Sequence, residues 1–125
     1  EEHRPQQTGV LPVNPSSVVY PAVVYIRDHL QQEITMMEMA DLCHLSPSYF
    51  SRTFNKETGE SFVNYISSRR IQLAKELLLE TGKSISQIAE VVGYDNISHF
   101  TAVFKRTEGI TPSAYRSSKK RKKFS

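Results

Sequence analysis

Four polar side chains share one face of a short segment: Ser48, Ser51, Arg52 and Asn55. Phe50 and Phe54 are four residues apart in the same segment, so in a helix both point to the opposite, core-facing side. Arginine can bridge O6 and N7 of a guanine, and serine is an adaptable partner at base edges. We therefore expect this face to read bases in a major groove, with Pro47 and Lys56 at the DNA backbone. For one isolated helix, an ordinary solvated surface remains the plainer alternative.

The pattern returns later in the chain, which weakens that plainer alternative. SPSYFSRTFNKETG (46–59) is followed by NISHFTAVFKRTEG (96–109), with the paired phenylalanines and the final glycine kept. Ala40 corresponds to Ala89 at an offset of 49, and Phe50 to Phe100 at an offset of 50. The second copy therefore has one added residue in its turn. Each copy reads as a short helix, a turn and a second helix, which is the helix-turn-helix outline.

The outward face of the second copy is less polar. Its members are Ile97, Ser98, His99, Thr101 and Ala102, followed by Lys105 and Arg106. Ile97 or Ala102 could contact a thymine methyl group, although neither can hydrogen-bond to a base. For His99 we leave open a base contact, a phosphate contact and an ordinary surface position. We expect Thr101, Lys105 and Arg106 to lie at the DNA backbone.

Helix-capping signals predict the elements that carry these faces. Thr35 with Glu38, and Ser84 with Gln87, have the spacing of a capping box at the start of a short helix. Ser46 before Pro47 is a good start for the helix at about 47–57, and a matching helix is expected at 96–107. Between the two copies, residues 62–80 form the longest predicted helix. Its apolar stripe comprises Phe62, Tyr65, Ile66, Leu73, Leu77 and Leu78.

These elements predict an all-α fold of about seven helices, with two helix-turn-helix units at about 36–59 and 85–109. A helix pattern precedes them from about Val18, with Pro21 in its first turn and Leu30 on its apolar side. A last short helix is expected to run from Pro112 through Tyr115. We read residues 1–16 as a linker or disordered lead-in, 17–116 as the domain, and 117–125 as a basic tail. A 19-residue helix is roughly 28 Å long, and successive major-groove faces lie roughly 34 Å apart. The long helix could therefore act as a rigid spacer between two readers, with DNA bending covering an imperfect match.

From about Val18 to Arg116 the chain resembles the AraC/XylS-type DNA-binding domain of bacterial transcription activators. The resemblance rests on Phe-x-x-x-Phe-x-Lys-x-x-x-Gly in the first unit and on the second-unit residues Gly93-Tyr94, His99-Phe100, Phe104-Lys105-Arg106 and Gly109-Ile110-Thr111-Pro112-Ser113-Ala114-Tyr115-Arg116. It implies seven helices and two recognition helices in successive major-groove segments on one DNA face. Carried over by position, the base-reading candidates are Ser48, Ser51, Arg52, Ile97, Ser98, His99 and Ala102. The chain departs from the family at Ala102, where many members have a longer polar or basic residue.

Composition separates the function classes further. The net charge of +3 depends on five bases at 119–123, because the rest of the chain has 11 basic and 13 acidic residues. We find no phosphate-binding loop, no metal-ligand spacing and no G-x-S-x-G motif, so we expect neither an enzyme nor a cofactor or metal. No apolar run is long enough to span a membrane. The single cysteine, Cys43, reads as a buried apolar residue in a reducing compartment.

Taken together, these patterns predict the double-stranded DNA-binding part of a cytoplasmic bacterial transcription regulator. We expect an N-terminal sensor or dimerisation domain to precede it in a longer protein, since the lead-in is rich in proline and the chain lacks a starting methionine. An activator must also touch RNA polymerase, which makes polymerase a candidate partner. The alternative is a helical protein-interaction module without specific DNA binding. For the basic tail, three roles stay open: a solvated and disordered end, contacts with DNA phosphates, and a membrane surface.

Overall fold

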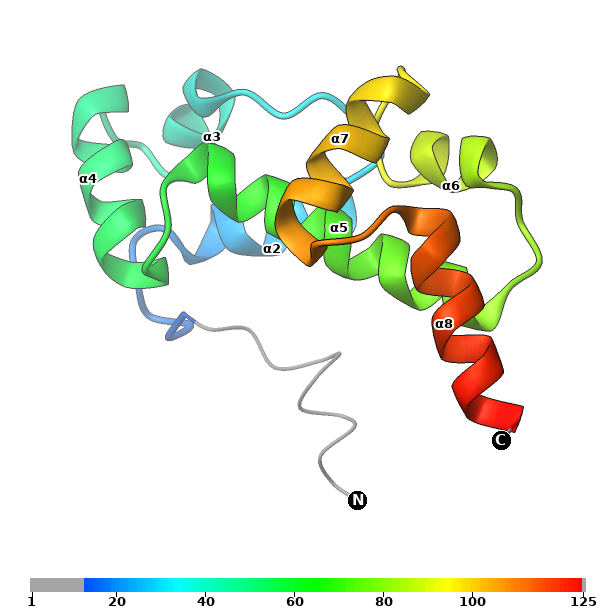
Figure 1. Cartoon of the computed structure of the whole chain (residues 1–125). Coiled ribbons are helices and arrows are strands. Elements are labelled where there is room, and N and C mark those ends of the chain that lie inside the picture. The colour runs from blue at the N-terminus through cyan, green and yellow to red at the C-terminus, as the bar shows by residue number, and fades with distance from the viewer. Residues whose placement is uncertain (1–12, 125) are drawn as a thin grey trace. The chain divides into compact units, whose positions relative to one another are not determined.

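The computed structural model describes residues 13–124, with side chains described through Lys119. Within this range the chain forms helices and no strand (Figure 1). The helices are α2 (Tyr20–Asp28), α3 (Met36–Leu42), α4 (Pro47–Thr58), α5 (Phe62–Glu80), α6 (Ile85–Val91), α7 (Ile97–Glu108) and α8 (Pro112–Phe124). The predicted all-α fold of about seven helices is confirmed. The described residues form two compact units, 13–28 with 34–62 and 29–33 with 63–124. Most of the expected lead-in lies outside them; of its last residues, Val13 is buried.

The first helix-turn-helix motif consists of α3, a turn and α4. Thr35 and Glu38 form the predicted capping box, in which the Thr35 hydroxyl accepts from the Glu38 amide and the Glu38 carboxylate accepts from the Thr35 amide. The Ser46 hydroxyl accepts from the Tyr49 amide at 3.2 Å and caps α4. Gly59 ends α4 in the left-handed conformation, with φ at 83°, a backbone state that glycine adopts without steric cost.

The second motif has the same helix lengths as the first, with caps and turn hydrogen bonds at the same positions. Ser84 and Gln87 form the other predicted capping box, and Asn96 caps α7. α3 and α6 both have 7 residues, and α4 and α7 both have 12. The turns close with matching hydrogen bonds, from the Leu45 amide to Ala40 O at 2.9 Å and from the Tyr94 amide to Ala89 O at 2.8 Å. The two copies change from an offset of 49 to an offset of 50 just after these bonds. The added residue that the sequence predicts in the second turn is therefore Asp95.

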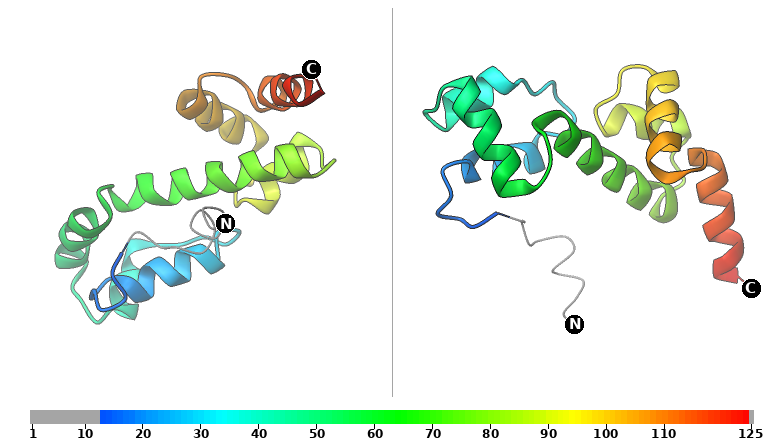
Figure 2. Two further views of the ribbon diagram at one scale, coloured as in Figure 1. Left: turned by 90° about the horizontal axis from the view of Figure 1, so that it is seen from below. Right: turned by 60° about the vertical axis from the view of Figure 1, so that its left-hand side comes forward.

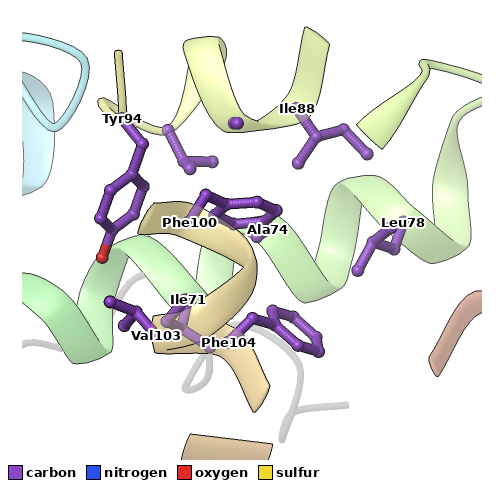
Figure 3. Close-up of a cluster of buried hydrophobic side chains, with 10 residues drawn as sticks. Ile71, Ala74, Leu78, Ile88, Tyr94, Phe100, Val103 and Phe104 are labelled. Carbon is purple, nitrogen blue, oxygen red and sulfur yellow. The ribbon is translucent and has the colours of Figure 1, made fainter. Parts of the chain in front are cut away.

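Each motif buries its paired phenylalanines completely, as predicted. Phe50, Phe54, Phe100 and Phe104 are all 0% exposed. In the first unit the Phe62 ring lies edge-on to Phe50 and Phe54, with centroids 5.7 and 5.6 Å apart. In the second unit, side chains from α5, α6 and α7 gather in one cluster (Figure 3). Cys43 is buried, and burial raises the pKa of its thiol, which agrees with its reading as a small apolar residue.

α5 is the longest helix, with the 19 residues that its apolar stripe predicts, and it is uninterrupted (Figure 2). It ends at Glu80, where Arg116 caps it by donating to Leu78 O at 2.9 Å and to Thr81 O at 3.1 Å. Gly82, the next glycine in the chain, lies beyond that point and is not left-handed. Arginine side chains can satisfy the last carbonyls of a helix in place of a glycine cap.

Two predicted helix boundaries are wrong. α2 ends at Asp28, so Leu30 lies outside it, and the Leu30 carbonyl accepts a hydrogen bond from Arg70. α8 continues past Tyr115 to Phe124, although the predicted helix ended at Tyr115 and 117–125 was predicted to be a basic tail. Lysine and arginine are good helix formers, and repulsion between like charges one turn apart costs only a few tenths of a kcal/mol.

The repeat also extends further than the sequence pattern suggests. α5 and α8 begin at Phe62 and Pro112, positions that differ by the same offset of 50. Each helix then places a base over a tyrosine ring: Arg69 is 5.4 Å from the Tyr65 centroid, and Lys119 is 5.8 Å from the Tyr115 centroid. Each motif is therefore followed by a helix that begins in the same way.

Candidate nucleic-acid interface

α4 presents a polar face whose central arginine is held in place. Ser48, Arg52 and Asn55 are exposed, whereas Ser51 is half-buried at the edge of the face. Arg52 Nη1 donates to Ser48 Oγ at 2.8 Å, and the guanidinium lies 6.0 Å from the centroid of the Tyr49 ring. These contacts reduce the side-chain freedom that Arg52 would otherwise lose on binding. The remaining guanidinium donors are available for a planar acceptor pair such as a guanine edge.

Tyr49 also lies on this face, although it was not among the predicted residues. It is 48% exposed and contacts Arg52 from the preceding turn. The signal was present in the repeat, since Tyr49 corresponds to His99 at the offset of 50 and His99 was already a candidate. Pro47 and Lys56, the two expected backbone contacts, are exposed at opposite ends of α4.

α7 presents the corresponding face of the second motif. Ile97, Ser98, His99 and Ala102 are exposed, and Thr101 is half-buried like its counterpart Ser51. Lys105 and Arg106 are exposed in the last turn. All the predicted residues of each motif therefore lie on or beside the outward side of one helix. Arg52 has no equivalent here, because Ala102 occupies that position.

His99 is partly fixed by its neighbours. Its ring lies edge-on to the Tyr94 ring, with centroids 5.2 Å apart and planes at 87°. Tyr94 is buried, and this burial raises the pKa of its hydroxyl, opposed by a hydrogen bond with Ser67. The His99 amide donates to the Asn96 cap at 3.1 Å. The Tyr94 contact orients the imidazole, and the amide bond belongs to the helix cap. Neither decides which of its three proposed roles His99 has.

Charge is distributed unevenly around the two ends of α7. A surface hollow of about 240 Å³ lies between α6 and the start of α7 and is lined by Ser86, Ala89, Glu90, Tyr94, Asp95 and Ile97. Its only charged side chains are carboxylates, which repel phosphate. At the other end, Lys75 pairs with Glu108 at 3.2 Å, so this acid does not oppose the exposed Lys105 and Arg106. The unpaired positive charge of α7 is therefore concentrated at its C-terminal end.

Arg70 supports the turn of the second motif, and no sequence signal pointed to it. It donates from Nε to Leu30 O at 3.1 Å and from Nη2 to Gln32 O at 2.8 Å, bonds that span 40 and 38 residues. Its guanidinium also lies 5.7 Å from the Tyr94 ring centroid. Burial lowers the pKa of this guanidinium, and the Tyr94 hydroxyl opposes that shift. Arg70 thus ties the 29–33 segment to the turn that leads into α7.

The described residues hold neither a metal-binding cluster nor a membrane-spanning helix. Within 13–119 no three acidic, histidine or cysteine side chains are grouped so that they could hold a metal ion. Among the helices described, none combines the length and the apolar character needed to cross a membrane. The candidate residues are therefore those of the two helix faces.

Comparison with known proteins identifies the family of the domain. A family model described as a helix-turn-helix domain matches residues 39–118. The chain is 36% identical over 97 residues to the uncharacterized HTH-type transcriptional regulator YobQ of Bacillus subtilis, covering 78% of the chain and 40% of YobQ. It is 39% identical over 92 residues to the bifunctional transcriptional activator/DNA repair enzyme AdaA of Bacillus subtilis, covering 74% of the chain and 44% of AdaA. The chain thus spans less than half of either relative.

Among solved structures, the chain is similar to the C-terminal domain of AraT, a response regulator from Geobacillus stearothermophilus. The TM-score is 0.78 at 38% identity, and the match covers 82% of this chain and 86% of that domain. The similarity therefore extends over most of this chain and most of that domain.

Proposed function

Because the chain belongs to the AraC/XylS-type helix-turn-helix family of DNA-binding domains of transcription regulators, we propose that it binds double-stranded DNA sequence-specifically by placing α4 and α7 in the major groove. One observation carries this proposal: both helices bury their phenylalanines and expose their polar positions at matched places. If these positions were only an ordinary solvated surface, the same pattern would not be expected in both motifs. The second helix of such a motif is the one that enters the groove.

In the first motif, we assign base contacts to Ser48, Ser51, Arg52 and Asn55. Arg52 is the central one, because it can bridge a guanine, and Asn55 can pair with an adenine edge. Pro47 and Lys56 are assigned to the DNA backbone at the two ends of α4. The same logic assigns bases to Ile97, Ser98, His99 and Ala102, and the backbone to Thr101, Lys105 and Arg106.

We further propose that the two helices enter successive major-groove segments of one site. α5 joins the motifs in the chain, and its 19 residues correspond to a length of roughly 28 Å. The groove repeat is roughly 34 Å, and bending a site to cover such a difference costs of order 1–6 kcal/mol. A site of two segments about one turn apart follows from this proposal.

Selection from random duplex DNA with the purified chain tests the proposal directly. We expect enrichment of one site with two conserved segments, bound at least about a thousandfold more tightly than random duplex. Affinity should fall steeply with salt, because phosphate contacts release counterions. Retention of every sequence alike, or no salt-dependent binding, would instead support a helical protein-interaction module.

The basic end of α8 offers further phosphate contacts. Lys119 is exposed on this helix, and four more bases follow it in the sequence. Replacing residues 119–123 by glutamine keeps a good helix former while removing five charges. We expect the slope of log affinity against log salt to become shallower by about 0.9 for each lost phosphate contact. An unchanged slope would indicate that residues 119–123 are solvated and do not contact DNA phosphates.

One observation favours a protein partner in addition to DNA. α3 exposes two apolar side chains, Met37 at 68% and Leu42 at 41%, beside the exposed acids Glu38 and Asp41. The carboxylates of this face would be repelled by the phosphates of DNA, so we propose that the face binds a protein. RNA polymerase is the partner that an activator requires, and loss of activation with DNA binding intact in a Met37→Ser variant would support this role.

We also propose that the chain is the C-terminal part of a longer cytoplasmic regulator that acts by binding and not by catalysis. The lengths of its relatives support an additional domain, which we expect to sense a signal or to dimerise. The mass of the native gene product tests this expectation, since a product of about the size of this chain would contradict it.

A further inference from the structure

The two motifs differ most at the outward centre of their second helices. In α4 the three positions are held by Ser48, Arg52 and Asn55, and at the offset of 50 the corresponding residues of α7 are Ser98, Ala102 and Lys105. Arginine and asparagine can each form paired hydrogen bonds with a base edge. Alanine offers only a methyl group at the position where the first motif has its guanidinium. The same helix frame thus presents different recognition chemistry.

The entry to α7 is apolar as well. Ile97 is the first residue of the helix and is 44% exposed, whereas α4 begins with Pro47. One turn later, Thr101 is half-buried and also carries a methyl group, and Ala102 beside it is exposed. In the major groove, the C5-methyl of thymine is the apolar group that such side chains can contact.

Charge around Ile97 favours a base contact over a phosphate contact. Glu90 and Asp95 line the hollow beside it, and carboxylates repel the DNA backbone. The basic residues of α7, Lys105 and Arg106, lie at its other end. A helix with this polarity meets the backbone with its C-terminal end and leaves its N-terminal end for the bases.

Resting on the function proposed above, we infer that the second motif recognises thymine through its C5-methyl group, with Ile97 and Ala102 as the contacting residues. The first motif recognises its segment by hydrogen bonds from Arg52. The bound site therefore has a guanine in one segment and one or more thymines, recognised by their methyl groups, in the other.

Deoxyuridine substitution tests this inference, because deoxyuridine lacks only the methyl group and keeps the pairing of thymine. Each thymine of the selected site is replaced in turn, and the affinity of the chain is measured at fixed salt. We expect one or two replacements to weaken binding by about threefold to fivefold each, the effect of one apolar carbon group removed from contact. All other replacements should be close to neutral.

Variants identify the side chain that contacts each methyl. In Ile97→Ala, one of the sensitive thymines should become insensitive to replacement, while Ile97→Val keeps most of the effect. Ile110→Ala is the matched control, since Ile110 is 39% exposed in the same unit but lies beyond the end of α7. Arg52→Ala should leave the sensitivity to deoxyuridine unchanged, because it acts on the other segment.

The possible failures are distinguishable. A selected site that lacks thymine in one segment, or that tolerates deoxyuridine at every thymine, would refute methyl recognition while leaving DNA binding intact. Sensitivity that persists in Ile97→Ala and in Ala102→Gly would refute the assigned residues. If selection enriches no site at all, the proposed function fails and this inference fails with it.

Discussion

The turns of the two motifs have the same path but different tolerance for a side chain. His44 and Gly93 occupy equivalent positions at an offset of 49, and both have positive φ, at 61° and 104°. A Cβ on Gly93 would lie 2.3 Å from Leu30 O and 2.7 Å from Arg70 Nε. His44 occupies its left-handed position with its side chain exposed. The same turn conformation therefore accepts histidine at position 44 but requires glycine at position 93, where Leu30 and Arg70 pack against it.

α4 and α7 differ in the chemistry of their exposed side chains and not in the packing of their backbones. Their frames are the same length and bury the same phenylalanines, yet their outward residues differ in chemistry. The buried phenylalanines of such a helix are constrained by packing and are the same in both motifs. Its exposed side chains can differ without disturbing that packing. The turn comparison concerns stability and the face comparison concerns recognition, so each can be altered separately.

Replacing Gly93 by alanine should have the largest effect on stability. The new Cβ would clash with a backbone oxygen that cannot move freely, and the left-handed conformation costs a further 1–2 kcal/mol or so for an L-residue. We expect a loss of about 3 kcal/mol or more in the free energy of unfolding, measured by urea denaturation. Gly82→Ala is the control, because nothing lies within 4 Å of a Cβ there and its φ is ordinary; an equal loss in both variants would contradict the close approach.

Arg52→Ala tests the recognition side of the comparison. We expect a loss of about 1–3 kcal/mol on the preferred site and relaxed preference at one or two base pairs. Ser48→Ala should reproduce part of this loss, since it removes the hydrogen bond that holds the guanidinium. Equal weakening on every sequence would show that Arg52 contacts phosphate.

The variant Ala102→Arg tests whether the second motif can recognise guanine in the way proposed for Arg52 in the first. Ser98 lies four residues before position 102, as Ser48 does before Arg52, so it can hold a new guanidinium in the same way. We expect a new preference for guanine of about 1 kcal/mol in one segment, the lower end of what a bidentate contact gives. A selection that returns the original site unchanged would place this helix away from the bases.

The contrast between frame and face also explains what could be predicted from sequence. Capping boxes such as that of Thr35 and Glu38, the buried phenylalanines and the added residue at Asp95 are local or repeated signals. Arg70 was missed because its partners are about forty residues away in the chain. The extension of α8 was not predicted, because a strongly charged segment gives no apolar helical pattern even though lysine and arginine are good helix formers. The positions of the interface residues followed from helix periodicity, but the contacts between Arg52 and its neighbours depend on side-chain conformation, which periodicity does not specify.

His44→Gly should give the smallest effect, with the opposite sign to Gly93→Ala. Glycine removes the steric cost of the left-handed conformation, and part of this gain is offset because glycine has more conformational freedom to lose on folding. The net result should be an increase of about 0.5–1 kcal/mol in the free energy of unfolding. His44→Asn should fall between the two, as asparagine tolerates this region better than histidine does. If both variants are less stable than the parent, the imidazole must stabilise the turn by contacts of its own, and the two turns would differ in more than the packing against Gly93.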